Sequence, residues 1–172
     1  MSLKTRFGNL GNILDFTNLI KENIYVLDSP ILSNSQLDKF INFFGQNSKT
    51  IDCTFSKDEN LDSAIERIQR ESEISARQGL TQLVLSDKNI SNERLPIPML
   101  LSVGAVNTHL IKKKLRGYVS INAQTGEALD THSFATLIGV GATTVNPYLA
   151  LDSLYQRFEK KLFGKFGYDE CI

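Results

Sequence analysis

Strand-like and helix-like segments alternate along this chain from residue 50 onward, and this alternation constrains the fold more than any other feature. Short apolar, β-branched runs occur at residues 50–55, 82–86, 117–122 and 143–146. Each run is followed by apolar residues that recur every three or four positions, which is typical of a helix. Four successive strand–helix units predict right-handed crossovers and a parallel sheet. We therefore expect an α/β fold with repeated βα units, resembling half of an eight-unit barrel.

The expected helices show start and stop signals. Gly79 is placed to end the first of them, and Pro98 and Pro147 lie at first-turn positions, where a missing N–H costs nothing. Asn146 is expected to cap the last helix. The helix after Pro98 is apolar on nearly every side, which predicts burial on several sides. These helices are expected at residues 61–77, 98–115, 130–139 and from 147 onward.

The N-terminal part lacks this regular pattern. Residues 1–32 contain scattered glycines and no sustained period, so we expect an irregular arm made of loops and short extended pieces. A short amphipathic helix follows, capped by Ser33 or Ser35, with Leu37 and Phe40 on its apolar face. We predict an α/β domain over residues 33–172.

Composition excludes several classes of function. Lys plus Arg and Asp plus Glu both number 19, so no polyanion such as nucleic acid is expected as a partner. No apolar run approaches the roughly 18 residues needed to cross a bilayer, and no signal peptide is recognisable, so we expect no membrane association. The two cysteines, Cys53 and Cys171, are too few for a thiolate metal site. We expect a soluble protein of a reducing compartment.

A glycine-rich turn, "IGVGATT" at residues 138–144, has the texture of a phosphate-binding loop. A dinucleotide-binding loop needs its glycines after a strand and before a helix, whereas Gly139 and Gly141 follow a helix and precede a strand. We interpret them as a helix terminator and a tight turn. "VNPYLA", which begins at Val145, lies at the end of a strand, where α/β proteins bind ligands, but Asn–Pro is also an ordinary helix start.

Titratable side chains offer few catalytic arrangements. His109 and His132 lie on separate expected helices, without the spacing of a metal site on one helix. Asp87 follows the second strand, and Glu127 and Asp130 follow the third, so they could form a carboxylate pair for acid–base catalysis. Caps and solvated turn residues are the alternative interpretation. The residues alone leave both open.

Three segments carry a resemblance to a known family. They read "LDSPILSNSQLDKF", "LVLSDKNISNERLPIPMLLSVGAVNTHLIKKKLR" and "QTGEALDTHSFATLIGVGATTVNPYLAL". Together they resemble the central domain of the large subunit of glutamate synthase, in its ferredoxin-dependent or NAD(P)H-dependent form. The likeness extends from about Asn9 to Leu151 and is expected to fade beyond it, so that the chain is truncated relative to the family.

The resemblance implies a segment of an oxidoreductase that is itself non-catalytic. In that family a glutaminase domain releases ammonia, and an FMN barrel with an iron–sulfur cluster reduces the imine made from 2-oxoglutarate. The central domain connects these two sites and supports the ammonia tunnel between them. Its implied partners are the glutaminase and FMN-binding domains of the same enzyme, and the segment itself holds no cofactor. L-Glutamate biosynthesis in the cytoplasm, or in a eukaryote the plastid stroma, is the implied setting.

The same resemblance suggests residues that contact other domains or support the tunnel: Asp87, His109, Gln124, Thr125, His132 and Asn146. Where the family pattern reads "VHHHL" this chain has "VNTHL", and "ETGEAREVHH" becomes "QTGEALDTHS". Two alternatives stay open, an autonomous small α/β enzyme that uses the strand ends and a protein that docks to a separate synthase. Nothing in the segment indicates the electron donor.

Overall fold

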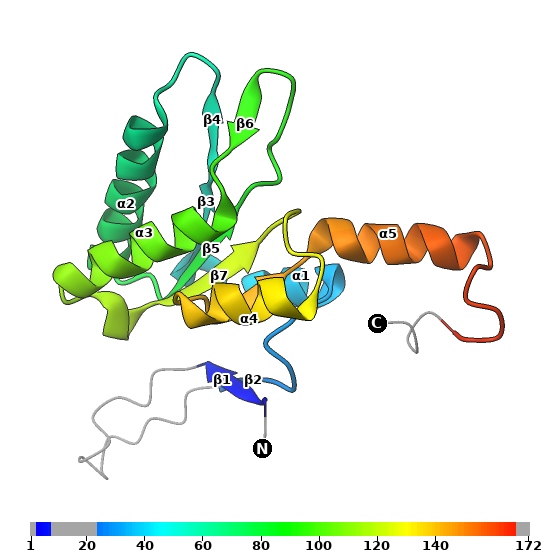
Figure 1. Ribbon diagram of the computed structural model, residues 1–172. Coiled ribbons are helices and arrows are strands. Elements are labelled where there is room, and N and C mark those ends of the chain that lie inside the picture. Colours follow the sequence, from blue (N-terminus) through cyan, green and yellow to red (C-terminus); the bar gives the residue numbers. More distant parts are fainter. Residues whose placement is uncertain (1–2, 8–23, 168–172) are drawn as a thin grey trace, which may run out of the picture. The chain divides into compact units, whose positions relative to one another are not determined.

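The computed structural model describes residues 3–7 and 24–167 (Figure 1). The chain divides into two compact units, residues 1–30 and residues 31–172. In the first unit, strand β1 (Thr5–Phe7) pairs antiparallel with β2 (Tyr25–Leu27). The remainder of the expected N-terminal arm lies outside the described residues. The predicted division of the chain after residue 32 stays a prediction.

A four-stranded parallel sheet forms the centre of the second unit, in the order β3–β5–β7–β8. These strands are β3 (Ser48–Asp52), β5 (Gln82–Ser86), β7 (Ser120–Gln124) and β8 (Thr144–Asn146). The described helices are α1 (Asn34–Phe44), α2 (Leu61–Arg77), α3 (Met99–Lys112), α4 (Thr131–Gly139) and α5 (Tyr148–Glu159). The predicted α/β class with a parallel sheet is confirmed.

One face of this sheet is apolar and carries the main core. The register aligns Ile51, Leu85 and Ala123 in one row across neighbouring strands. Right-handed crossovers place α2, α3 and α4 on the same side of the sheet, and Figure 1 shows these helices together. Their buried residues join the row in one cluster, which includes Ile68, Val103, Val106, Leu110 and Leu137.

The opposite face of the sheet carries mainly polar side chains, together with the buried Val84 of β5. Side chains alternate along a strand, so the residues between the apolar ones point the other way. The register aligns Ser86 with Gln124 and Gln124 with Asn146 on this face. The amide nitrogen of Asn146 donates to Asn34 Oδ1 at 3.0 Å, which places the start of α1 there. The pattern therefore separates an apolar face under α2, α3 and α4 from a face rich in amides and hydroxyls next to α1.

A second polar row crosses the middle of the sheet. Asn122 Nδ2 donates to Gln82 Oε1 at 3.2 Å, and Thr144 Oγ1 donates to Asn122 Oδ1 at 2.7 Å. All three side chains are at most 3% exposed. Such buried polar groups are tolerated because they satisfy one another.

The strand expected at residues 50–55 is wrong in extent, since the structure has two strands there. Asp52 Oδ1 accepts hydrogen bonds from the backbone nitrogen of Thr54 at 2.9 Å and from its hydroxyl at 2.7 Å. The chain turns at this point, and β4 (Thr54–Ser56) pairs antiparallel with β6 (Arg94–Pro96). Arg94 forms an ion pair with Asp52 at 3.1 Å, which holds this two-stranded ribbon to the end of the sheet.

The strand expected at residues 117–122 begins later, at Ser120, because Arg116–Tyr118 form a 3-10 turn. Arg116 Nη1 donates to the Val119 carbonyl oxygen at 2.6 Å, and Arg116 Nε donates to Asn107 Oδ1 at 2.7 Å. These hydrogen bonds hold residues 116–118 in the turn, so the regular strand begins only after it.

Helix ends agree in part with the expected signals. Ser33 forms a capping box with Gln36 at the start of α1, and α4 ends at Gly139 as predicted. The expected cap of α5 by Asn146 is wrong: Pro147 holds that position, and the Asn146 amide donates to the Leu32 carbonyl oxygen at 2.9 Å instead. The helix after Pro98 is also less covered than expected, because its outer positions are exposed, at Leu100, Leu101 and Ile111.

Candidate polar site at the carboxyl edge of the sheet

The carboxyl ends of β5, β7 and β8 bring four of the six candidate residues together. Thr125 Oγ1 donates to Asp87 Oδ2 at 2.6 Å, and Gln124 Nε2 donates to Asn146 Oδ1 at 3.3 Å. The backbone nitrogen of Thr125 donates to the Asn146 carbonyl oxygen at 3.0 Å. We call Asp87, Gln124, Thr125 and Asn146 the carboxyl-edge network. It lies where parallel α/β sheets bind ligands.

Asp87 is the charged residue of the network, and it is 0% exposed. Its carboxylate accepts hydrogen bonds from the Thr125 hydroxyl and from the backbone nitrogen of Gly126. The Gly126 nitrogen lies 3.1 Å from Asp87 Oδ1 and 3.2 Å from Asp87 Oδ2. A buried carboxylate is costly unless hydrogen bonds replace its water. The loop after β7 supplies these donors. The loop therefore satisfies the buried carboxylate, and the carboxylate in turn holds the loop in place.

The same loop reaches the start of helix α3. Glu127 Oε2 accepts a 2.8 Å hydrogen bond from the backbone nitrogen of Met99, and it thereby caps a helix whose Pro98 gives no side-chain cap. Asp130 caps α4 through the backbone nitrogen of Ser133 at 2.7 Å. The acidic residues considered as a catalytic pair with Asp87 are therefore engaged as separate helix caps.

A directed chain of side-chain hydrogen bonds runs along the polar face. The Ser86 hydroxyl donates to Gln124 Oε1 at 2.7 Å, and each following amide accepts from one neighbour and donates to the next. The chain passes from Gln124 through Asn146 to Asn34, and it ends at Asp152 Oδ1 of α5 at 3.3 Å. It joins the sheet, α1 and α5.

Tyr148, at the first turn of α5, faces the network. Burial raises the pKa of Tyr148 to about 12, and the negative charge of Asp87 and a hydrogen bond to it act in the same direction. Lys88 Nζ lies 5.9 Å from the centre of the Tyr148 ring. Tyr148 was not among the predicted candidates, because nothing in the sequence pairs it with a carboxylate two strands away.

His109 lies apart from the network, between α2 and α3. Its Nε2 atom is 2.7 Å from Glu73 Oε2, and Lys113 Nζ is 3.3 Å from the same oxygen. Hydrogen bonds from Arg77 and then from His109 lower the pKa of Glu73 to about 2. This cluster ties two helices of the apolar layer together. Glu73 was missed as well, since only the packing of α2 on α3 brings these groups together.

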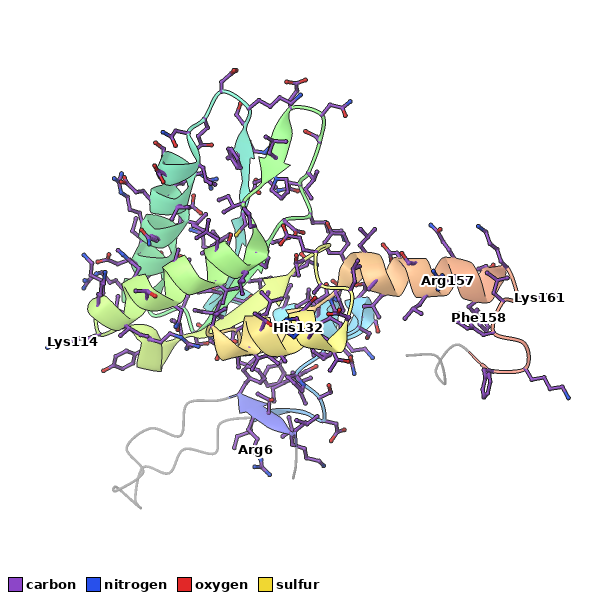
Figure 2. The ribbon with its side chains drawn as sticks, in the orientation of Figure 1. Arg6, Lys114, His132, Arg157, Phe158 and Lys161 are labelled. Carbon is purple, nitrogen blue, oxygen red and sulfur yellow. The ribbon has the colours of Figure 1, made fainter. Side chains whose placement is uncertain are left out.

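His132 also lies apart, exposed in the first turn of α4 (Figure 2). Its backbone carbonyl accepts from the Thr136 hydroxyl at 2.8 Å, which is a contact within the helix. Among the described residues, no cluster of three or more His, Cys, Asp or Glu side chains could hold a metal ion. No helix in the described part is long and apolar enough to cross a membrane.

The chain's own residues do not fit the cofactors that the resemblance implies for the larger enzyme. An iron–sulfur cluster is held by several thiolates, whereas burial raises the pKa of the Cys53 thiol to about 12 and Cys171 is the only other cysteine of the sequence. A flavin phosphate needs free donors, but the donors of the carboxyl-edge network are used internally. Within residues 3–7 and 24–167, every buried side-chain nitrogen and oxygen has a hydrogen-bond partner.

Comparison with known proteins gives a family over nearly the whole chain. The family model for the glutamate synthase central domain matches residues 1–170. The NADPH-dependent glutamate synthase large chain of Azospirillum brasilense is 46% identical over 167 residues, which are 95% of this chain and 11% of that protein. The corresponding large chain of Bacillus subtilis is 41% identical over 148 residues, 85% of this chain and 10% of that protein.

A ferredoxin-dependent relative is similar too. The chloroplastic enzyme of Oryza sativa subsp. japonica is 38% identical over 162 residues, 91% of this chain and 10% of that protein. This chain therefore spans about a tenth of the length of these relatives. The family match reaches residue 170, so the expected loss of likeness after Leu151 is wrong.

Proposed function

Because the chain belongs to the family of glutamate synthase central domains, we propose that it is a structural connector between a glutaminase site and an FMN site. In this role it supports the passage of ammonia between them during L-glutamate synthesis. The glutaminase and FMN-binding domains of the same enzyme are its partners. FMN and the iron–sulfur cluster belong to those other domains. The setting is the cytoplasm or, in a eukaryote, the plastid stroma.

The carboxyl-edge network is the observation that carries this proposal. In an α/β enzyme the side chains at this edge are turned toward substrate or cofactor. Here Asp87 accepts hydrogen bonds from Thr125 and Gly126, and the side-chain amides of Gln124 and Asn146 are hydrogen-bonded to each other. Side chains that satisfy one another rigidify a fold rather than bind a ligand. This favours a connecting role over an autonomous enzyme.

A chimera tests the proposal. In the Azospirillum brasilense large chain, which is 46% identical over the matched residues, this chain would replace the corresponding segment. A second chimera would carry a flexible linker of equal reach in its place. We expect the first chimera to couple glutamine hydrolysis to glutamate formation. We expect the linker chimera to release free ammonium while its two half-reactions continue.

Two results would contradict the connector role. One is a linker chimera that couples both reactions without releasing ammonium. The other is catalysis by the purified chain alone, such as glutamate release from glutamine, which would favour the autonomous enzyme. Saturable FMN binding by the chain alone, measured by quenching of flavin fluorescence, would contradict the assignment of the flavin to another domain.

A further inference from the structure

Helix α5 is attached to the sheet mainly through its first turn. Leu151 is the only residue between Tyr148 and Glu159 that is fully buried, whereas Leu149 and Tyr155 are about half exposed, at 49% and 51%. Figure 1 shows the helix projecting away from the sheet, and Figure 2 shows Arg157, Phe158 and Lys161 at its far end. The direction of the whole helix therefore depends on the contacts of a few residues at its start.

Gly126 lies against the start of α5. A Cβ atom built on Gly126 would lie 3.0 Å from the Tyr148 hydroxyl oxygen, 3.3 Å from Tyr148 Cζ and 3.6 Å from Leu149 Cβ. The two contacts with Tyr148 are tighter than nine in ten real Cβ contacts, so a side chain at residue 126 would require the Tyr148 ring or the start of α5 to shift by a few tenths of an ångström. Absence of a side chain at this position lets the helix sit directly on the loop after β7.

The position of Gly126 is itself fixed by Asp87. Its backbone nitrogen donates to both carboxylate oxygens, and the neighbouring Thr125 hydroxyl donates to Asp87 Oδ2. The Tyr148 hydroxyl oxygen would lie 3.0 Å from a Cβ on Gly126, and burial together with the negative charge of Asp87 raises its pKa. One buried carboxylate thus holds the loop on which the start of α5 rests through Tyr148.

A second contact restrains rotation of the helix. Asn34 Nδ2 donates to Asp152 Oδ1 at 3.3 Å, one turn after Tyr148. Asn34 is held in turn by the amide of Asn146 at 3.0 Å. Two anchors one turn apart define a direction, which a single anchor does not.

We propose that Asp87 and Gly126 are positioning residues that set the direction in which α5 leaves the sheet. Tyr148 is the side chain of α5 that packs against them. This inference rests on the proposed connector function for its biological meaning, because a connector must hold fixed angles between the parts that it joins. The direction of α5 can nevertheless be measured on the chain alone.

The test is a distance measurement between two spin labels by double electron–electron resonance. Labels are placed at Ser63→Cys on α2 and Gln156→Cys on α5, both exposed, in the full chain with Cys171→Ser. Cys53 is 0% exposed and escapes labelling. Tyr148→Phe removes the hydroxyl that faces Asp87, and Gly126→Ala adds the obstructing Cβ. Tyr155→Phe on the same helix and Gly104→Ala, which has open space around its Cβ position, are the matched controls.

We expect one narrow distance distribution in the parent and in both controls. Tyr148→Phe should broaden it, and Gly126→Ala should shift its maximum, with circular dichroism reporting that the remaining fold is intact. A parent distribution that is already broad overturns the proposal, as does a Tyr148→Phe distribution that matches the parent. Neither result depends on ammonium release by the chimera, so failure of the connector function and failure of this inference are distinguishable.

Discussion

Arg116 Nη2 donates a 2.9 Å hydrogen bond to the carbonyl oxygen of Gly141. The same guanidinium also bonds Asn107 of α3 and the carbonyl oxygen of Val119 just before β7. It therefore braces one helix, one strand and the turn between α4 and β8 at the amino edge of the sheet. Burial lowers the pKa of Arg116 below its ordinary value, but a guanidinium is charged at neutral pH.

The first prediction concerns this turn. Gly141 has a φ of +128°, and a Cβ atom there would lie 2.5 Å from Asn107 Cγ. Gly141→Ala should lower the free energy of unfolding by about 1–3 kcal/mol from backbone strain alone, and further by displacing Asn107 from Arg116. Urea denaturation measures the loss. Gly139→Ala is the control, since its Cβ position is open; a similar loss in both variants would contradict the role of the brace.

Thr125→Val tests the support of the buried carboxylate. The substitution keeps the shape of the side chain but removes the hydroxyl that donates to Asp87 Oδ2 at 2.6 Å. We expect a loss of about 2 kcal/mol in the free energy of unfolding, because a charged buried group loses a hydrogen-bond donor. Chemical denaturation checks this, with Thr108→Val on the exposed side of α3 for comparison. Equal stability of both variants would show that Asp87 does not depend on Thr125.

Asn146→Asp should be more damaging. The Asn146 side chain is 1% exposed and its nitrogen donates to Leu32 O and Asn34 Oδ1, so a carboxylate would face two oxygens without a proton to give. We expect a loss of about 3 kcal/mol or more at neutral pH. Asn42→Asp on the exposed side of α1 should cost far less.

This deficit should depend on pH. The new carboxyl would have a pKa above its unfolded value, so its penalty is complete above the folded pKa and shrinks as pH falls toward the unfolded value of about 3.9. Unfolding midpoints of the variant and the parent, measured from neutral pH down to about 4, report the difference. A deficit that is constant over this range would contradict the explanation by charge.

Glu73 predicts a different pH dependence for the parent protein. Hydrogen bonds from Arg77 and then from His109 lower its pKa from 4.5 to about 2. A lowered acid pKa stabilises the folded state above the unfolded pKa, and that contribution is lost as pH falls from 4.5 to about 2. Glu73→Gln should therefore flatten the acid limb of the stability curve. Glu66→Gln, whose exposed partner is Arg70, should leave that limb steep.

Local periodicity predicted the long elements well. The helix expected at residues 61–77 has those bounds in the structure, because the apolar spacing and Gly79 agree; the cap by Asn60 was not predicted. The break after Asp52 and the short strand at Arg94 were not predictable in this way. The short strand depends on an ion pair between residues 42 positions apart, and the break depends on the hydrogen bonds from Thr54 to the Asp52 side chain, which apolar periodicity does not report.

The candidate residues fall into two groups, those whose position follows from the order of the strands and those whose position depends on helix packing. Asp87, Gln124, Thr125 and Asn146 directly end or follow parallel strands, so topology alone places them at one edge. His109 and His132 lie on helices, and their surroundings depend on how those helices pack. The contacts of Glu127 with Met99 and of Tyr148 with Asp87 join separate βα units, which is why the sequence alone did not reveal them.

The buried row of Gln82, Asn122 and Thr144 has a consequence for how the chain selects its native pairing. Strand residues alternate between two faces, so a shift of β7 by one position would move Asn122 into the aliphatic layer beneath α3 and turn Ile121 toward the amides. The amide of Asn122 finds matching partners in only one alignment of the three strands. A row of this kind adds little net stability, but it raises the free energy of every misaligned sheet by leaving buried polar groups unpaired. It therefore selects one strand register during folding.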